Sequence, residues 1–272
     1  MNHFIHNIDP IIVSFGPFRI GWYGLMYVIS FILGYFLVKR NFKKKNIVLK
    51  DEYYESFIIS IVVGVMVGAR LGYVLFYDIG YYLENPLRIF YVWQGGMSFH
   101  GGLIGVIISA LLFCKKYKLD FYTLADAAIP FVALGIGFGR IGNFINGELY
   151  GKATELPWAV IFLRTDPEML PRHPSQLYEA LFEGFLMAAF LQFILFKTKI
   201  KGLTFWLFIL GYGIVRFLIE LVRLPDNLPM YDNGMLFNLF SMGQVLSLLM
   251  IIAAIIGIVS LSIHKPKPPQ PS

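Results

Sequence analysis

A short segment near the middle of the sequence combines charged and amide side chains with several glycines. It covers residues 137–151, and its polar members include Arg140, Asn143, Asn146 and Glu148. The segment ends an apolar stretch long enough to cross a bilayer, where a guanidinium needs a counter-charge or an anionic ligand. Glycines allow irregular backbone to approach a bound molecule closely. The pattern predicts a site for an anionic headgroup at the edge of the lipid.

A second group of ionisable residues follows helical spacing. Tyr212, Arg216, Glu220 and Arg223 lie at positions i, i+4, i+8 and i+11, which places them on one face of a helix. One interpretation is a stripe of ion pairs in which Glu220 neutralises both arginines. One glutamate beside two arginines, however, leaves positive charge that suits a phosphate. Because ionisable residues inside membrane segments are functional by default, we favour ligand binding.

Other candidate site residues lie near the starts of further apolar segments. His100 precedes two glycines, and it is either a structural histidine or a base, since histidine accepts a proton near neutral pH. Tyr23 lies near the outer end of the first apolar segment. Residues 173–179 have the pattern of a helix start, in which Gln176 and Glu179 are also candidates to line the site.

The apolar content of the chain indicates its class. Of its 272 residues, 57% are hydrophobic and 15% are charged, against roughly 25% charged in a soluble protein. The mean hydropathy is +0.65, and the apolar residues form runs near the ~20 residues that a bilayer requires. We therefore predict an all-α, polytopic integral membrane protein with about seven transmembrane helices. They cover residues 20–38, 56–77, 98–114, 122–142, 177–196, 203–221 and 236–263.

The lysines and arginines predict the orientation of these spans. Fourteen of the twenty-three follow the first, third, fifth and seventh spans, so they share one side, which the positive-inside rule makes cytoplasmic. The N-terminus is then outside, the C-terminus is cytoplasmic, and the longer loops near 78–97 and 143–176 are extracytoplasmic. We expect residues 1–263 to form a single integral membrane catalytic domain and residues 264–272 to form a disordered, basic, proline-rich tail.

The depth of the polar residues in the spans predicts where a site lies. At about 1.5 Å of rise per helical residue, Arg70, Arg140 and Arg216 fall in the outer half of a hydrocarbon core about 30 Å thick. His100 and Glu183 enter from the outer side and reach similar depths. Polar groups from several spans therefore converge on the outer leaflet.

Several other classes of protein and site are excluded by the sequence. The net charge of +6 has no base-reading context, which argues against nucleic acid, and the single cysteine, Cys114, excludes a disulfide framework. A G-x-G-x-x-G pattern at residues 137–142 ends a membrane helix instead of following a strand, so we reject a nucleotide site.

Gly64, Gly68 and Gly72 repeat every fourth residue, which predicts close packing of two helices.

Four blocks of the sequence resemble the signature of one enzyme family, the prolipoprotein diacylglyceryl transferases. They occur in the family's order, and the resemblance spans nearly the whole chain. The blocks are Ser98-Phe-His-Gly-Gly-Leu103, Gly139-Arg-Ile-Gly-Asn-Phe-Ile-Asn-Gly-Glu-Leu-Tyr-Gly151, His173-Pro-Ser-Gln-Leu-Tyr-Glu179 and Tyr212-Gly-Ile-Val-Arg-Phe-Leu-Ile-Glu-Leu-Val-Arg-Leu-Pro-Asp226.

The resemblance implies a reaction and a location. Such enzymes move the diacylglyceryl group of phosphatidylglycerol to the lipobox cysteine in the signal peptide of a bacterial prolipoprotein, which leaves a thioether and releases glycerol phosphate. The resemblance implies neither a metal nor an organic cofactor. It places the chain in the bacterial cytoplasmic (inner) membrane, with membrane lipid as its surroundings and the active site toward the outer leaflet.

The resemblance also implies roles for individual residues. Arg140 and Arg216 would bind the phosphate, and His100 would be the base, with Tyr212 as the alternative base or as a donor to the phosphate. The remaining residues would bind the headgroup, hold the loop or position Arg216: Tyr23, Asn143, Asn146, Glu148, Gly151, Glu220 and Arg223. The main alternative is a transporter or flippase for an anionic lipid or solute, but such proteins often have two related halves, which this sequence lacks.

Overall fold

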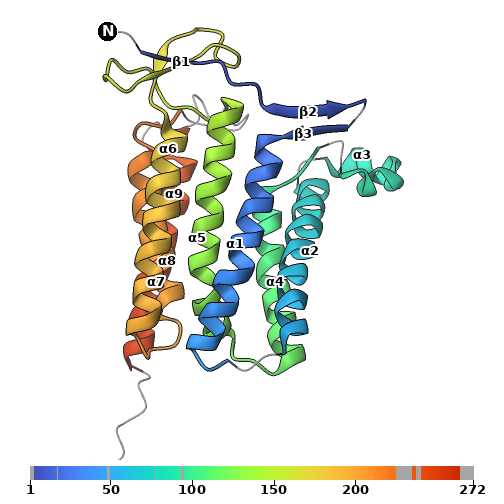
Figure 1. Ribbon diagram of the computed structural model, residues 1–272, viewed down its shortest axis with the longest axis vertical. Helices are drawn as coiled ribbons and strands as arrows, with labels where there is room; N and C mark the ends of the chain where they lie inside the picture. Colours follow the sequence, from blue (N-terminus) through green and yellow to red (C-terminus); the bar gives the residue numbers. More distant parts are fainter. Residues whose placement is uncertain are drawn as a thin grey trace, which may run out of the picture. The chain divides into compact units, whose positions relative to one another are not determined.

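The computed structural model describes residues 3–16, 18–47, 50–76, 78–92, 95–224, 235–236 and 240–263, and the fold is mostly helical (Figure 1). Within these ranges, five helices are long and apolar enough to cross a membrane. They are α1 (Trp22–Lys44), α2 (Asp51–Phe76), α5 (Phe121–Asn146), the continuous helix made of α6 (Ser175–Glu179), η3 (Ala180–Phe185) and α7 (Leu186–Lys197), and α9 (Met242–Ile263). The chain is therefore a multi-pass membrane protein.

Helices also occupy the other two predicted spans. These are α4 (Phe99–Tyr117) and α8 (Leu203–Ile219), of which α8 is apolar but shorter. The last helix begins later than the predicted residue 236, because β6 (Met235–Leu236) pairs there with β7 (Phe240–Ser241). A capping box then starts α9: the Ser241 hydroxyl accepts the Gln244 N–H at 3.1 Å, and Gln244 Oε1 accepts the Ser241 N–H at 3.0 Å.

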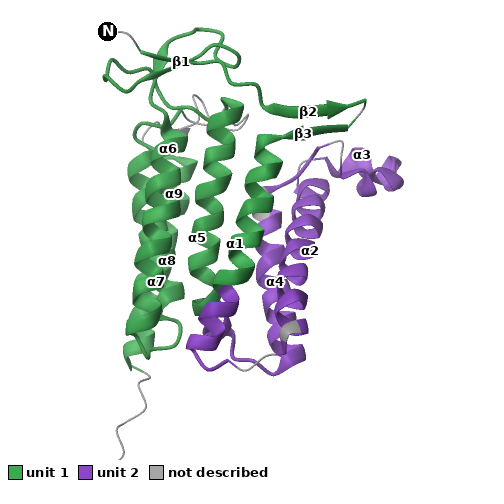
Figure 2. Cartoon of the chain, viewed as in Figure 1, with its two compact units in different colours: residues 1–37, 126–272 green, residues 38–125 purple. Residues whose placement is uncertain are grey.

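The chain divides into two compact units (Figure 2). Residues 1–37 and 126–272 belong to the first unit, and residues 38–125 belong to the second. A single catalytic domain over residues 1–263 stays a prediction. The predicted disordered tail, residues 264–272, lies outside the described residues.

In the second unit, glycines bring the backbones of α2 and α4 together. A Cβ on Gly68 would overlap the carbonyl oxygen of Gly101, and a Cβ on Gly64 or Gly72 would meet the backbone of Gly105 or Gly101 in the same way. This confirms that the repeated glycines serve close helix packing. It also gives Gly101, one of the two glycines that follow His100 in sequence, a packing role.

Arg70, near the end of α2, organises the loop that follows this helix. Its side chain is buried, its guanidinium lies over the Tyr82 ring at 5.2 Å, and it donates hydrogen bonds to backbone carbonyls of the loop. The acceptors are Arg88, Ile89, Tyr91, Gly95 and Gly96. These contacts hold the loop that contains α3 (Ile79–Glu84) and η1 (Pro86–Phe90). Arg70 is thus a structural cation in this unit.

In the first unit, the segment predicted as a long outer loop contains strands that the sequence pattern did not predict. β4 (Val160–Phe162) pairs with β5 (Pro171–Arg172) in antiparallel fashion and with β1 (Phe4–His6) in parallel fashion, and β2 (Ile11–Phe15) and β3 (Phe18–Gly21) form a separate hairpin (Figure 1). The β1–β4–β5 sheet gives the segment between α5 and α6 a fixed course.

A buried ion pair holds this outer segment together. Arg172 donates to Asp166 through Nε at 2.6 Å and through Nη2 at 2.9 Å, and its guanidinium lies over the Tyr150 ring at 5.1 Å. The Arg172 guanidinium holds the pKa of the Asp166 carboxyl below its ordinary value. His6 of β1 packs against two aromatic rings of this unit. Its ring centroid lies 5.1 Å from those of both Phe144 and Phe162.

Helices α5, α7 and α8 share a hydrophobic core that fixes their relative positions. Its buried residues are Ile129, Ala133, Met187, Ala188, Leu191 and Phe208. At one end of these helices, Asp126 of α5 accepts the backbone N–H groups of Gly202 and Phe205 at the start of α8, at 2.7 and 2.8 Å. At the other end, α5 and α8 finish and α6 and α9 begin, and this is where the polar network lies.

Candidate functional site

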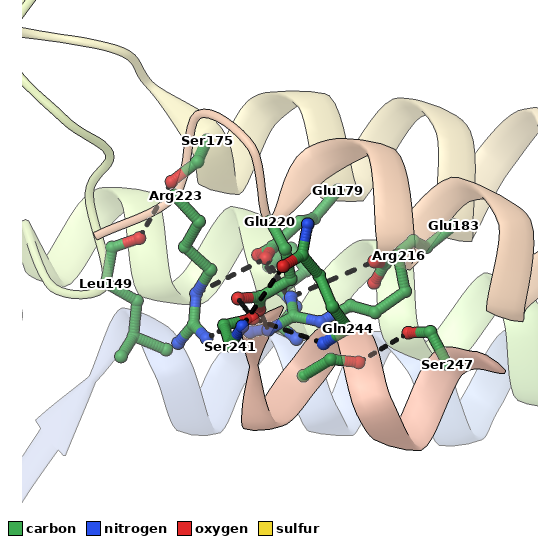
Figure 3. A network of polar contacts seen from close by, with 12 residues as sticks. Leu149, Ser175, Glu179, Glu183, Arg216, Glu220, Arg223, Ser241, Gln244 and Ser247 are labelled. Carbon is green, nitrogen blue, oxygen red and sulfur yellow. Dashed lines mark hydrogen bonds and ion pairs between the residues drawn. The ribbon is translucent and has the colours of Figure 1, made fainter. Parts of the chain in front are cut away.

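The carboxylate of Glu179 is the centre of the polar network (Figure 3). Glu179 ends α6 and is fully buried. Its Oε2 lies 3.1 Å from Nε of Arg140 on α5, and its Oε1 lies 2.5 Å from Nη1 of Arg216 on α8 and 3.7 Å from Nε of Arg223. One buried carboxylate therefore joins three guanidinium groups from separate parts of the chain.

A second carboxylate, that of Glu220, fixes two of these arginines. Its Oε1 contacts Arg216 and lies 3.3 Å from Nη1 of Arg223, and its Oε2 accepts the Ser241 hydroxyl at 2.8 Å. Gly243 leaves room for this arrangement, because a Cβ at that position would collide with the Glu220 carboxyl group. The start of α9 thus orients Glu220 toward the arginines (Figure 3).

The amides of the signature segment bind its own glutamate. Asn143 and Asn146 both donate to Glu148 Oε1, at 2.8 and 3.3 Å, and Gln176 donates to the Glu148 carbonyl at 2.6 Å. The Ser175 hydroxyl binds the next carbonyl, that of Leu149, at 2.9 Å. The start of α6 therefore anchors the turn that follows Arg140. These are the contacts expected if the two asparagines hold the loop.

Gly151 lies where the signature segment meets the end of α8. Its N–H binds the His173 carbonyl at 2.8 Å, the N–H of Lys152 binds the Val222 carbonyl at 2.8 Å, and Gly151 forms an isolated β-bridge with Arg223. A Cβ on Gly151 would meet the Val222 carbonyl oxygen at 2.5 Å and His173 Cβ at 2.7 Å. Any side chain would therefore push the signature segment away from the turn that carries Arg223.

The two predicted tyrosines have different surroundings. Tyr212 on α8 packs against the hydrophobic core that α5, α7 and α8 share, and it interacts electrostatically with Arg140 and Arg216. Tyr23 on α1 lies 3.2 Å from Tyr27, oxygen to oxygen, and packs against Gly142, whose Cβ would fall 2.7 Å from the Tyr23 ring.

His100, the predicted base, lies in the first turn of α4, in the second unit. Its side chain is outside the described part of the structure, so its catalytic role stays a prediction. The structure does not place it relative to the arginines of the first unit.

The sequence analysis predicted one carboxylate beside the arginines, whereas the structure shows a second one, Glu179, in direct contact with them. That prediction paired Arg216 and Arg223 with Glu220 alone and gave Glu179 no defined partner, whereas Glu179 contacts both arginines and Arg140 as well. The predicted helical stripe also ends early: α8 stops at Ile219, and Arg223 follows a turn. A usable signal was the i, i+4 spacing of Glu179 and Glu183 in one apolar helix.

This arrangement can bind an oxyanion. Arginine presents a planar fork of donors that matches phosphate geometry, and the carboxylates hold these forks in fixed orientations before a ligand arrives. The Arg140 and Arg216 side chains keep 19% and 12% of their surface exposed, whereas Glu179 keeps none. The accessible part of the network is therefore cationic.

Comparison with known proteins relates the chain to one family. The family model described as prolipoprotein diacylglyceryl transferase matches residues 10–260. The phosphatidylglycerol–prolipoprotein diacylglyceryl transferase of Geobacter sulfurreducens is 44% identical over 262 residues, which cover 96% of this chain and 98% of the relative. The proteins of the same name from Bordetella parapertussis and Aliivibrio fischeri (strain ES114) are 47% and 44% identical, over 90% and 92% of this chain and 92% and 88% of the relatives. The chain therefore belongs to the prolipoprotein diacylglyceryl transferase family.

Proposed function

We propose that this protein transfers the diacylglyceryl group of phosphatidylglycerol to the lipobox cysteine of prolipoproteins. In this reaction the thiol sulfur forms a bond to the glyceryl carbon, the bond from that carbon to the phosphate oxygen breaks, and glycerol phosphate leaves. The thiol proton passes to a base. The observation that supports this proposal most strongly is the Glu179 carboxylate, which holds Arg140 and Arg216 together in a member of this family.

In this proposal the arginines stabilise the leaving group. A phosphodiester becomes a phosphomonoester, so negative charge grows on its oxygens as the carbon–oxygen bond breaks. Preorganised cations in a site with little water stabilise such charge more strongly in the transition state than in the substrate. Arg140 is the most exposed of the three arginine side chains, so we assign the first phosphate contact to it. Arg216 supplies the second.

The remaining predicted residues support this chemistry. His100 is the proposed base, with Tyr212 as the alternative. Tyr23, Asn143, Asn146, Glu148 and Gly151 would shape the headgroup pocket, and Glu220 and Arg223 would position Arg216. An unperturbed cysteine thiol has a pKa of about 8.5, so a base or a positive field is needed to form its thiolate.

We further propose the topology that the charges indicate. The chain would cross the bacterial cytoplasmic membrane seven times as one catalytic domain, residues 1–263, with the N-terminus outside, the C-terminus inside and the site toward the outer leaflet. Supporting this, lysines occupy the last turns of α1, α4 and α7, which close the first, third and fifth spans.

Mass spectrometry tests the reaction directly. The purified protein would be incubated with phosphatidylglycerol and a peptide that carries a lipobox cysteine. We expect the peptide to gain the mass of one diacylglyceryl unit while glycerol phosphate appears in equal amount. An unmodified peptide, together with lipid or solute flux across proteoliposomes, would instead identify a transporter or flippase.

A further inference from the structure

Glu183 is a buried acid in the polar network that makes no hydrogen bond within the described part of the chain. Its side chain is fully buried, and neither carboxyl oxygen has a hydrogen-bond partner among the residues that the structure describes. Its only ion-pair contact within those residues joins Oε1 to Arg216 Nη1, at 3.9 Å. Glu179, one helical turn earlier, makes the short contacts with the arginines instead. The two glutamates therefore differ in their bonding.

The backbone around Glu183 is specialised. Glu183 lies in η3, a π-helical turn, which is a rare feature that often occurs at functional sites. The next residue, Gly184, packs against Gly137 of α5 so closely that a Cβ on Gly184 would overlap the Gly137 Cα atom. This close approach packs the backbone beside Glu183 directly against α5.

The bonding pattern indicates the charge of Glu183. An ionised carboxylate that is buried without hydrogen bonds is strongly disfavoured, and such groups tend to take up a proton. Arg216 opposes protonation, but at 3.9 Å it forms no hydrogen bond to Glu183, and it already binds Glu179 and Glu220. We propose that Glu183 is a protonated, neutral carboxyl group that sets the net charge of the arginine network and thereby its affinity for the phosphatidylglycerol headgroup.

The protonation state of Glu183 determines the net charge of the network. With Glu183 neutral, three arginines face two carboxylates, Glu179 and Glu220, so one positive charge is left over. The phosphodiester of phosphatidylglycerol carries one negative charge, which matches it. If Glu183 ionises, the network becomes neutral overall and its attraction for the headgroup falls. This consequence rests on the proposed function, whereas the protonation state does not.

Other charged and titratable groups face Glu183 from each neighbouring element. Glu179 lies on its own helix, Arg140 is on α5, Tyr212 and Arg216 are on α8, and Arg223 follows α8. The arginines stay charged at every pH in the working range. A tyrosine hydroxyl such as that of Tyr212 stays protonated below its ordinary pKa of about 10. A pH-dependent change in the charge of the network below that pH therefore comes from a carboxyl group, and Glu183 is the one that has no hydrogen bond within the described part of the chain.

Infrared difference spectroscopy tests the protonation state. Glu183→Gln removes the acid and keeps the side-chain volume, and Glu179→Gln is the matched control on the same helix. At neutral pH, the wild type should show the carbonyl stretch of a protonated carboxylic acid, which shifts in D₂O and disappears in E183Q. In E179Q, a carboxylate band should disappear instead. A wild-type spectrum in which E183Q removes only carboxylate bands overturns the proposal.

Lipid binding tests the consequence. Phosphatidylglycerol would be titrated into the protein in phosphatidylcholine nanodiscs from neutral to alkaline pH. The phosphodiester does not titrate there, so any change in Kd reports the protein. Wild-type affinity should fall by up to about tenfold per pH unit once Glu183 ionises, while E183Q stays flat within about twofold. Equal slopes in both proteins would assign the titration to another group and overturn the proposed role.

Two further outcomes keep the tests separate. If E183Q does not insert, Glu183→Leu replaces it, because a neutral carboxyl without hydrogen bonds should be replaceable by an apolar side chain of similar volume. Failure of both variants to fold would overturn the proposal, since it would mean that the arginines require an ionised Glu183. A wild type that never lipidates the peptide would refute the proposed function alone, because the infrared result stands without it.

Discussion

Ser241 and Glu220 are joined by a hydrogen bond of 2.8 Å from the serine hydroxyl to the carboxylate Oε2. The same hydroxyl accepts the Gln244 N–H, so one oxygen both caps α9 and orients the glutamate that holds Arg216. The start of one helix thereby fixes an arginine at the end of another. In the proposed reaction, the phosphate contact of Arg216 depends on this link.

Ser241→Ala should therefore reduce both stability and transfer. Loss of the cap should cost about 1 kcal/mol of stability, and loss of a hydrogen bond to a charged group, roughly 1.5 kcal/mol, should lower kcat/KM by about tenfold. Ser241→Thr, which keeps the hydroxyl, should recover most of the rate. Ser262→Ala, near the other end of α9, is the control for a lost serine hydroxyl. Equal activity in all three variants would show that Ser241 does not position the site.

Arg140→Ala and Arg216→Ala should each severely reduce transfer while the protein still inserts. Removing one donor from a preorganised anion site lowers kcat by about 100-fold to 1000-fold. Arg164→Ala is the control, because Arg164 is exposed and pairs with Asp9 away from the network. Transfer would be followed by the mass gain of the lipobox peptide. Normal activity in either site variant contradicts the phosphate role.

Much of this fold could be predicted from hydropathy and spacing alone. A helix occupies most of every predicted span, and the i, i+4 pair Arg216–Glu220 is an ion pair as its spacing implied. The start of α9 was placed too early, because the apolar run from Leu236 continues into the helix and hydropathy alone does not mark where the helix begins. Ser241 and Gln244 still marked it, since a serine followed three residues later by glutamine predicts a capping box.

The partners of the buried charges were harder to predict, for a physical reason. Arg70 is satisfied by backbone carbonyls, which every residue carries and no sequence pattern identifies. Glu179 meets Arg140 only because α5, α6 and α8 pack against one another, so its role depends on tertiary structure. The spacing of Glu179 and Glu183 shows that they share a helix face, but not which helices that face meets.

Gly68→Ala should destabilise the protein through the contact between α2 and α4. The new methyl group would overlap the Gly101 carbonyl oxygen, and overpacking of this kind costs about 1–3 kcal/mol. Gly80→Ala is the matched control in the same unit, because a Cβ there meets nothing within 4 Å. Thermal unfolding in detergent would compare the two variants. A Gly68→Ala protein as stable as Gly80→Ala would contradict the role of this close contact in stability.

Asp166 should make the stability of the outer segment depend on acid pH. Its pKa is lowered in the folded protein, mainly by its hydrogen bond with Arg172, so its contribution is complete above its ordinary value of about 3.8. The contribution is lost as the pH falls through the lowered value. Hydrogen exchange of the β4 and β5 amides should therefore rise at strongly acid pH relative to Asp166→Asn, which lacks this titration. The same pH dependence in D166N would assign the effect elsewhere.

His6 should add a second pH dependence at milder acidity. Burial lowers the pKa of its ring below the ordinary 6.5, and nearby Arg164 acts in the same direction. Neutral His6 therefore stabilises the packing of β1 fully above about pH 6.5, and this stability is lost as the pH falls through the lowered pKa. His6→Phe keeps an aromatic ring between Phe144 and Phe162 but cannot take up a proton. Comparing hydrogen exchange of the β1 and β4 amides in the two proteins at each pH cancels the intrinsic chemistry of exchange. The wild type should lose protection between neutral and mildly acid pH while His6→Phe does not, and parallel losses in both proteins would show that His6 remains neutral throughout this range.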